Sequence, residues 1–90
     1  MLDGFISAAA ALVGCAIDPA LREWLLASHL SGERGHGAAL ARLARVPLVD
    51  CGMRLGEGTG AALVVPLLQS ALRLHAEMAT FAEAGVSDAV

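Results

Sequence analysis

The chain has 90 residues and a formal net charge of −3, and 57% of its residues are hydrophobic while 17% are charged. This length allows at most one small domain with a limited core. The sequence contains no lysine, and its six arginines are scattered, so no basic cluster could neutralise a run of phosphates and nucleic acid is excluded as a partner. A chain this short and this apolar is expected to cover its surface with a larger parent protein or a dimer partner.

The first predicted element is a helix from Phe5 to Ile17, with Asp3 as its expected N-terminal cap. Ser7 is the single side chain with a strong polar group in this run, so the helix is predicted to be buried on every side. The helix should end at residues 18–19, because the residue before a proline avoids the helical conformation.

The same run contains a sequence similar to a bacterial lipoprotein cleavage box, at residues 12–15. Asp3 places a negative charge where a signal peptide needs positive ones, and the run is too short to span a bilayer as a helix. An internal helix is therefore preferred, and a small lipoprotein is the alternative. The spacing of Cys15 and Cys51 matches no metal or redox motif, so both are expected to be free thiols.

The next segment combines a short helical turn at residues 20–23 with an apolar stretch at residues 24–28, typical of a buried strand in a parallel sheet. Residues 28–37 are the most polar part of the chain. Their hydroxyls, imidazoles and glycines suit a binding loop near phosphate or carboxylate, and a solvated loop that caps the next helix is the alternative. His29 and His36 are seven positions apart with no third good ligand, so no metal site is expected.

A second helix is predicted over residues 38–46, with Leu40 and Leu43 directed inward and Arg42 and Arg45 directed outward. Pro47 should stop this helix. Residues 48–52 then form a short extended link.

The last predicted helix begins at residue 58 or 60 and ends near residue 79. Residues 61–68 carry no polar side chain, so this half is predicted to be buried all round. Pro66 should kink the helix or mark a new start. In the second half, Gln69, Arg73 and Glu77 recur at four-residue spacing as one exposed stripe, and His75 is expected in a core or interface.

The stretch before this helix alternates glycines with one carboxylate and reads Met-Arg-Leu-Gly-Glu-Gly-Thr-Gly over residues 53–60. Glycine permits left-handed backbone and close approach of another molecule. The N–H groups that open the following helix could hold an anion beside the carboxylate. Glu57 is therefore a candidate general base. A phosphate-binding loop of the nucleotide hydrolases is excluded, because the lysine that it requires is missing.

This stretch resembles the C-terminal signature of the nicotinate-nucleotide–dimethylbenzimidazole phosphoribosyltransferase family. Further blocks resemble the same family in the same order: residues 3–6 with the alanine-rich run, residues 28–33 with 35–36, and residues 77–81 with 83–86. The resemblance covers nearly the whole chain but only the C-terminal part of a family member. It implies an α/β fold with a parallel sheet and helices. Residues 1–90 would be the C-terminal portion of a single, incomplete domain without an internal boundary.

By itself the chain is expected to be predominantly α-helical, with one or two short extended segments and with helices that pack against each other. The resemblance implies a pentosyl transfer. Nicotinate mononucleotide gives its phosphoribosyl group to 5,6-dimethylbenzimidazole, and α-ribazole 5′-phosphate and nicotinate are formed for the cobalamin nucleotide loop. Glu57 matches the family's catalytic base and would take the azole proton. A partial gene product of this kind is expected to be inactive alone.

The resemblance also implies substrate contacts, a homodimer in the full-length family, a cytoplasmic location, and no cofactor, metal or membrane partner. The substrate-binding candidates are Ser28, His29, Ser31, Arg54, Leu55, Gly56, Gly58, Thr59 and Gly60. A salt bridge is the alternative role for Arg54. A non-catalytic helical interaction module is the main rival for the chain, although such a module has no need of a carboxylate among three glycines.

Overall fold

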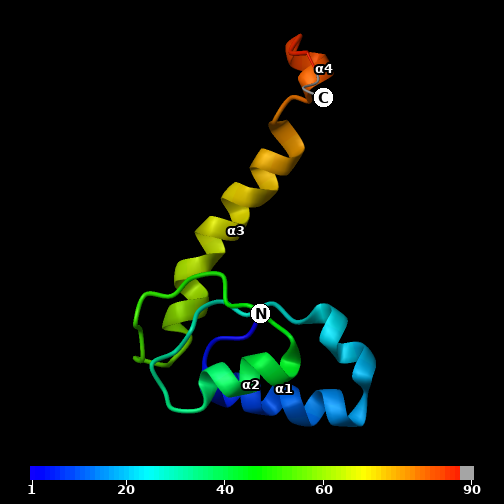
Figure 1. Cartoon of the computed structure of the whole chain (residues 1–90). Helices are drawn as coiled ribbons and strands as arrows, with labels where there is room; N and C mark the ends of the chain where they lie inside the picture. Colours follow the sequence, from blue (N-terminus) through cyan, green and yellow to red (C-terminus); the bar gives the residue numbers. More distant parts are fainter. Residues whose placement is uncertain (88–90) are drawn as a thin grey trace.

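The computed structural model of the chain describes residues 1–87. Its elements in chain order are helix α1 (Phe5–Ile17), the 3-10 helix η1 (Pro19–Trp24), and helices α2 (His36–Leu43), α3 (Thr59–Glu77) and α4 (Phe81–Ala84). Helices α1 and α2, η1 and the connecting loops form a compact body, and α3 projects from it with α4 at its outer end (Figure 1). The chain therefore consists of a small body and a long helical arm.

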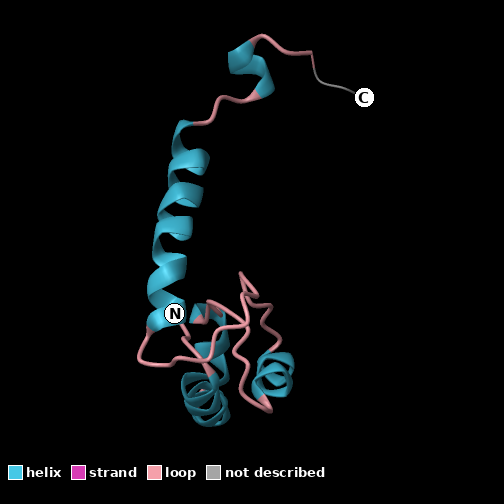
Figure 2. Ribbon diagram, turned by 90° about the vertical axis from the view of Figure 1, so that its left-hand side faces the viewer, coloured by secondary structure: helices cyan, strands magenta, loops and turns pink. Residues whose placement is uncertain are grey.

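Extended segments form the centre of the body. Leu2 pairs with Ala27 and His29 pairs with Val49, both in parallel, so the segment at residues 27–29 lies between the other two. Within residues 1–87 these pairings are isolated bridges rather than strands, and Figure 2 shows no strand in the described part of the chain. The predicted strand at residues 24–28 is therefore wrong: Trp24 still belongs to η1. The α/β fold of the whole family domain stays a prediction.

The core lies where α1 packs against α2 and η1. Leu40 and Leu43 of α2 are buried there, as predicted. Gly14 of α1 permits the approach of η1, since a Cβ at this position would lie 2.5 Å from a methyl group of Leu21. The buried members of this core are Leu2, Ala8, Ala11, Ala27, Ala39, Leu40 and Leu43.

Helix α2 begins two residues earlier and ends three residues earlier than predicted. Ala44 takes a left-handed conformation with φ of 55°, and its N–H group donates to the carbonyl oxygens of Ala41 and Leu40. This C-terminal cap ends the helix before Pro47. Arg45 is half-buried rather than outward, because its Nε–H donates to the carbonyl oxygen of Leu25 at 3.0 Å.

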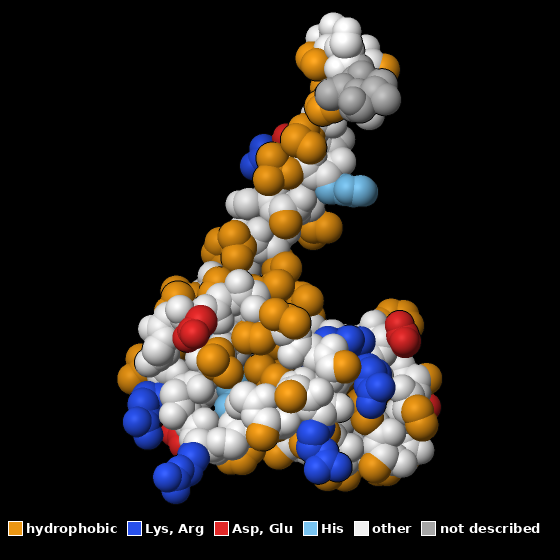
Figure 3. Space-filling model, viewed as in Figure 1, with side chains coloured by type: hydrophobic (Ala, Val, Ile, Leu, Met, Phe, Trp, Pro, Cys, Tyr) orange, Lys and Arg blue, Asp and Glu red, His pale blue; other side chains and the backbone are white. Residues whose placement is uncertain are grey.

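Helix α3 continues through Pro66 without a break. The prediction that its first half is buried all round is wrong, because Val64 is buried while Leu63 and Leu67 are 60% and 50% exposed. His75, predicted to be in a core or interface, is exposed. Apolar side chains are visible along the arm in Figure 3. The predicted packing of all helices against each other fails for α3, because the body contacts only its first turns.

Helix α1 has the predicted bounds but a different environment. Ala8 and Ala11 are buried against the body, whereas Ile6 and Ile17 are more than 80% exposed, so the prediction of burial on every side is wrong. Cys15, which would be the lipid-bearing residue of a lipoprotein, lies within α1 as a free thiol, and Cys51 is also free. Among the helices of residues 1–87, none has the length and hydropathy needed to cross a membrane.

Candidate active site

A cavity of about 660 Å³ opens where the start of α1, the polar loop and the glycine-rich stretch meet. The lining residues are Asp3, Gly4, Phe5, Ile6, Ser7, Ala10, His29, Ser31, Glu33, Arg54, Leu55, Gly56 and Glu57. Three segments that are distant in sequence thus build one site.

Glu57 lies on an exposed loop at the rim of this cavity. Its φ of +58° is left-handed, and Gly56 and Gly58 on either side have φ of +76° and +79°. The N–H group of Thr59 donates to the carbonyl oxygen of Gly56 at 3.0 Å and closes the turn. A left-handed residue other than glycine costs about 1–2 kcal/mol, so the backbone at Glu57 is strained. Strain of this kind is concentrated at functional sites.

The sequence suggested that the N–H groups at the N-terminus of α3 could hold an anion. In the structure that position is already filled. The carboxylate of Asp3 occupies that position, accepting from Gly58 at 3.2 Å and from Ala61 at 3.0 Å. The prediction that Asp3 caps α1 is therefore wrong, and it caps α3 instead. Gly4 is the N-terminal cap residue of α1, and its N–H group and that of Asp3 donate to the Ser7 hydroxyl.

Part of the polar loop forms a buried network: Ser28, His29, Ser31 and His36 are buried, whereas residues 32–35 are exposed and Gly35 caps α2, as the solvated-loop alternative expected. The Ser28 hydroxyl donates to the carbonyl oxygen of Leu2 at 2.7 Å and lies 3.1 Å from Nδ1 of His29. Nδ1 of His36 accepts from the N–H group of Ser31 at 2.8 Å. Burial lowers the pKa of His36 below its usual value, and the nearby His29 adds to this effect. These contacts hold the wall of the cavity that carries His29 and Ser31.

Arg54 and Glu33, which both line the cavity, form an ion pair with Nη2 and Oε1 3.9 Å apart. Both side chains are at least half exposed, so this ion pair contributes little to stability. The alternative role of Arg54 in a salt bridge is therefore observed. The guanidinium charge of Arg54 nevertheless remains close enough to attract an anion in the cavity.

The structure brings six of the ten predicted site residues to the cavity wall. These are His29, Ser31, Arg54, Leu55, Gly56 and Glu57. The other four lie behind the wall or at the start of α3: Ser28, Gly58, Thr59 and Gly60. The wall formed by residues 3–7 was missed, although this block carried part of the family resemblance, because it was interpreted only as a helix start. Within residues 1–87 no three His, Cys, Asp or Glu side chains form a group that could hold a metal.

The chain is similar to known phosphoribosyltransferases over nearly its whole length. A family model described as phosphoribosyltransferase matches residues 1–86. The nicotinate-nucleotide–dimethylbenzimidazole phosphoribosyltransferase of Azotobacter vinelandii is 61% identical over 99% of this chain, and that of Chromobacterium violaceum is 64% identical over 97%. In both cases the chain spans about a quarter (25%) of the relative's length.

The crystal structure of the same enzyme from Thermus thermophilus is also similar, with a TM-score of 0.88 and 53% identity. The similarity covers 98% of this chain and 26% of that one. Sequence and structure agree over nearly the full 90 residues, so the chain belongs to the nicotinate-nucleotide–dimethylbenzimidazole phosphoribosyltransferase family.

Proposed function

We propose that this chain is the C-terminal portion of a phosphoribosyltransferase domain. The complete enzyme transfers phosphoribosyl from nicotinate mononucleotide to 5,6-dimethylbenzimidazole and releases α-ribazole 5′-phosphate and nicotinate. The proposal rests on the relatives that carry this name and on one structural observation: Glu57 sits in a strained left-handed conformation at the rim of a cavity large enough for an aromatic base. The homodimer and the cytoplasmic location stay predictions.

In the proposed mechanism, the carboxylate of Glu57 accepts the N–H proton of the benzimidazole. Electron density on the opposite ring nitrogen rises, and this nitrogen forms a bond to the anomeric carbon of the ribose. The bond between that carbon and the pyridine nitrogen breaks at the same time, and its electron pair leaves with nicotinate. The configuration inverts from β to α, and the proton remains on Glu57 until it passes to water.

The other candidate residues are assigned to binding and positioning. Leu55 and Gly56 present an apolar side chain and open backbone to an aromatic base, and Arg54 places a positive charge near the nucleotide's phosphate or carboxylate. His29 and Ser31 line the same cavity. Ser28, Gly58, Thr59 and Gly60 support these surfaces from behind. Holding two reactants in line accounts for much of the rate enhancement in such reactions.

The 90 residues alone are expected to be inactive, so the test uses a hybrid enzyme. The chain replaces the matching quarter of the Azotobacter vinelandii relative, and formation of α-ribazole 5′-phosphate is measured. Glu57→Gln keeps the size of the side chain but removes the base, and kcat should fall by about 10²–10⁴-fold. Glu23→Gln, an exposed glutamate on η1, is the matched control. Turnover of Glu57→Gln near that of the unsubstituted hybrid would remove the assignment.

A further inference from the structure

The start of α3 is held by a side chain from the other end of the sequence. Gly58, the N-terminal cap residue of α3, has no side chain to cap the helix. The two oxygens of the Asp3 carboxylate do this instead: Oδ2 accepts from the Gly58 N–H group at 3.2 Å, and Oδ1 accepts from the Ala61 N–H group at 3.0 Å. Asp3 therefore satisfies two of the N–H groups that an α-helix leaves unpaired at its N-terminus.

The backbone of Asp3 is itself fixed to the body. Its N–H group donates to the Ser7 hydroxyl at 2.9 Å, and its carbonyl oxygen lies 3.1 Å from the Ser28 hydroxyl, sharing with the carbonyl oxygen of Leu2 the one proton that this hydroxyl donates. The preceding residue, Leu2, is paired in parallel with Ala27. The Asp3 carboxylate is thus carried by a segment that is fixed to the body. Its hydrogen bonds therefore fix the loop before α3 relative to the body.

The N–H group of Gly58 belongs to the peptide plane that begins at the carbonyl carbon of Glu57. A hydrogen bond to this group fixes the orientation of that plane and so restrains ψ of Glu57 and φ of Gly58, which is +79°. Glu57 has a left-handed glycine on each side, so without such a restraint the backbone of this loop could adopt many conformations. The direction of the Glu57 side chain therefore depends on the contact between Asp3 and Gly58.

We propose that Asp3 is a positioning residue, whose carboxylate holds the 56–60 loop so that Glu57 is directed into the cavity. This inference rests on the proposed role of Glu57 as the base. A carboxylate is needed because both oxygens accept. In Asn at this position the amide nitrogen is a donor, so one of the two backbone N–H groups loses its acceptor.

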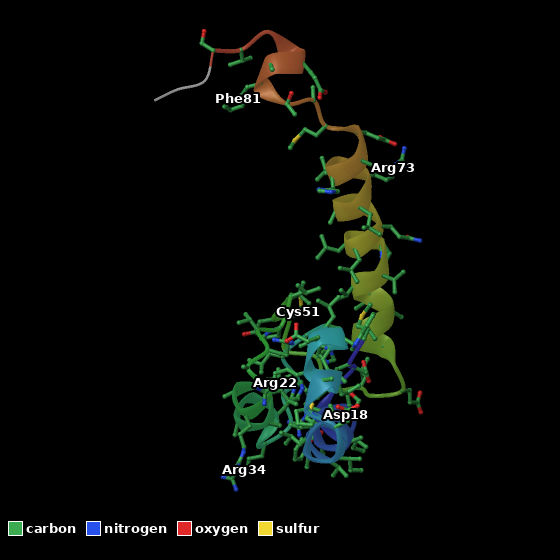
Figure 4. All side chains as sticks on the ribbon, turned by 90° about the vertical axis from the view of Figure 1, so that its right-hand side faces the viewer. Asp18, Arg22, Arg34, Cys51, Arg73 and Phe81 are labelled. Carbon is green, nitrogen blue, oxygen red and sulfur yellow. The ribbon has the colours of Figure 1, made fainter. Side chains whose placement is uncertain are left out.

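The first test is Asp3→Asn in the hybrid enzyme. We expect kcat to fall at least tenfold, because a displacement of about 1 Å in a reacting group can cost up to about 100-fold, while KM changes less than threefold. Amide hydrogen exchange over residues 56–61 should become faster. Asp18→Asn is the matched control: Oδ1 of Asp18 caps η1 by accepting from Ala20 at 3.0 Å. Asp18 lies in the body (Figure 4) and is not one of the residues that line the cavity. A kcat of Asp3→Asn within twofold of the hybrid would overturn the inference.

The second test separates positioning from general destabilisation. In a Glu57→Gln background the base is already lost, so adding Asp3→Asn should lower the remaining kcat less than twofold. Equal losses in both backgrounds would mean that Asp3 acts independently of Glu57, and would overturn the inference while the role of Glu57 stands.

Hydrogen exchange decides the two remaining cases. If Glu57→Gln keeps full turnover, the proposed function fails. Asp3→Asn must then still speed exchange over residues 56–61, or the restraint by Asp3 fails too. If Asp3→Asn does not fold, exchange is measured in the unsubstituted hybrid. Protected amides at Gly58 and Ala61 support the restraint, and exchange at the rate of an unstructured peptide overturns it.

Discussion

The α-carbon of Gly60 lies directly against the imidazole ring of His29. A Cβ built on Gly60 would overlap the Nδ1, Cε1 and Cγ atoms of that ring. Gly60 is in the first turn of α3, and His29 is in the central extended segment of the body, where the Ser28 hydroxyl lies 3.1 Å from its Nδ1. This contact and the Asp3 carboxylate join α3 to the body. Because any Cβ at residue 60 would overlap the His29 ring, glycine is required here by packing rather than by backbone conformation.

The first prediction follows from this contact. Gly60→Ala should lower the free energy of unfolding of the hybrid by about 1–3 kcal/mol, because the His29 ring or α3 must move. Gly37→Ala in α2 is the control, since its Cβ would meet the Leu30 side chain at an ordinary 3.9 Å and alanine favours a helix by about 1 kcal/mol. Urea denaturation measures both. Equal stability of the two variants would contradict the predicted overlap.

The second prediction concerns pH. His36 is 1% exposed, and its Nδ1 accepts a hydrogen bond, so the buried ring is neutral. Burial and the neighbouring His29 lower the pKa of His36 below 6.5, whereas Asp3 acts in the opposite direction. Between the lowered folded pKa and 6.5 the unfolded chain binds more protons. The stabilisation by His36 is therefore complete above pH 6.5 and is lost as the pH falls towards the folded pKa.

We expect the free energy of unfolding to decrease below about pH 6.5 by at most about 1.4 kcal/mol for each pH unit from this one group. Unfolding measured from about pH 7.5 to about pH 5 should show a smaller pH dependence in His36→Gln. His75→Gln is the control, because His75 is exposed on α3. Identical slopes in all three proteins would contradict a contribution from His36.

The sequence predicted the helices whose signals are local. The apolar run that ends at Asp18-Pro19 gave the bounds of α1, and the glycines before Thr59 gave the start of α3. The end of α2 was missed because Ala44, which has a Cβ and no sequence signal for a left-handed cap, takes φ of 55°. The short α4 was not predicted as a separate element.

Contacts between distant residues could not be predicted from local patterns. Asp3 precedes a helix, and its carboxylate was therefore assigned to that helix, whereas its donors lie 55 and 58 positions later. The apolar half of α3 was predicted to be buried because it carries no polar side chain. Such a pattern shows that the helix surface is apolar, but it does not show which residues cover that surface. The 87 described residues provide no cover for Leu63 or Leu67. Of the cavity lining, the glycine-rich pattern and the family resemblance pointed to Glu57 and the polar loop but not to residues 3–7, and the roles of these residues stay predictions.

The third prediction separates the two roles of Arg54. Arg54→Gln should leave stability within about 0.5 kcal/mol, because its ion pair with Glu33 is exposed. It should nevertheless raise KM for nicotinate mononucleotide, since a positive charge near the anion is lost. Glu33→Gln breaks the same ion pair but leaves Arg54 free, so KM should stay the same or decrease. Steady-state kinetics of the hybrid measure this difference, and a similar rise of KM in both variants would assign Arg54 to the salt bridge alone.

The last prediction uses the strained backbone of Glu57. Glycine adopts left-handed φ without the cost of about 1–2 kcal/mol that a residue with a Cβ bears. Glycine also increases the freedom of the unfolded chain, which offsets part of this gain. Glu57→Gly should therefore leave the free energy of unfolding unchanged or raise it by up to about 1 kcal/mol, although the variant loses the proposed base and its turnover.

Thr59→Gly is the matched control for Glu57→Gly. Thr59 follows Gly58 and is the first residue of α3, where the backbone is helical rather than left-handed; glycine is less favourable than other residues in a helix, so this variant should be less stable. Urea denaturation and α-ribazole 5′-phosphate formation are measured on the same samples. If Glu57→Gly keeps its stability and loses turnover, Glu57 is retained for chemistry and not for folding. A clear loss of stability in Glu57→Gly would contradict this prediction and would show that contacts of the Glu57 side chain hold its left-handed conformation.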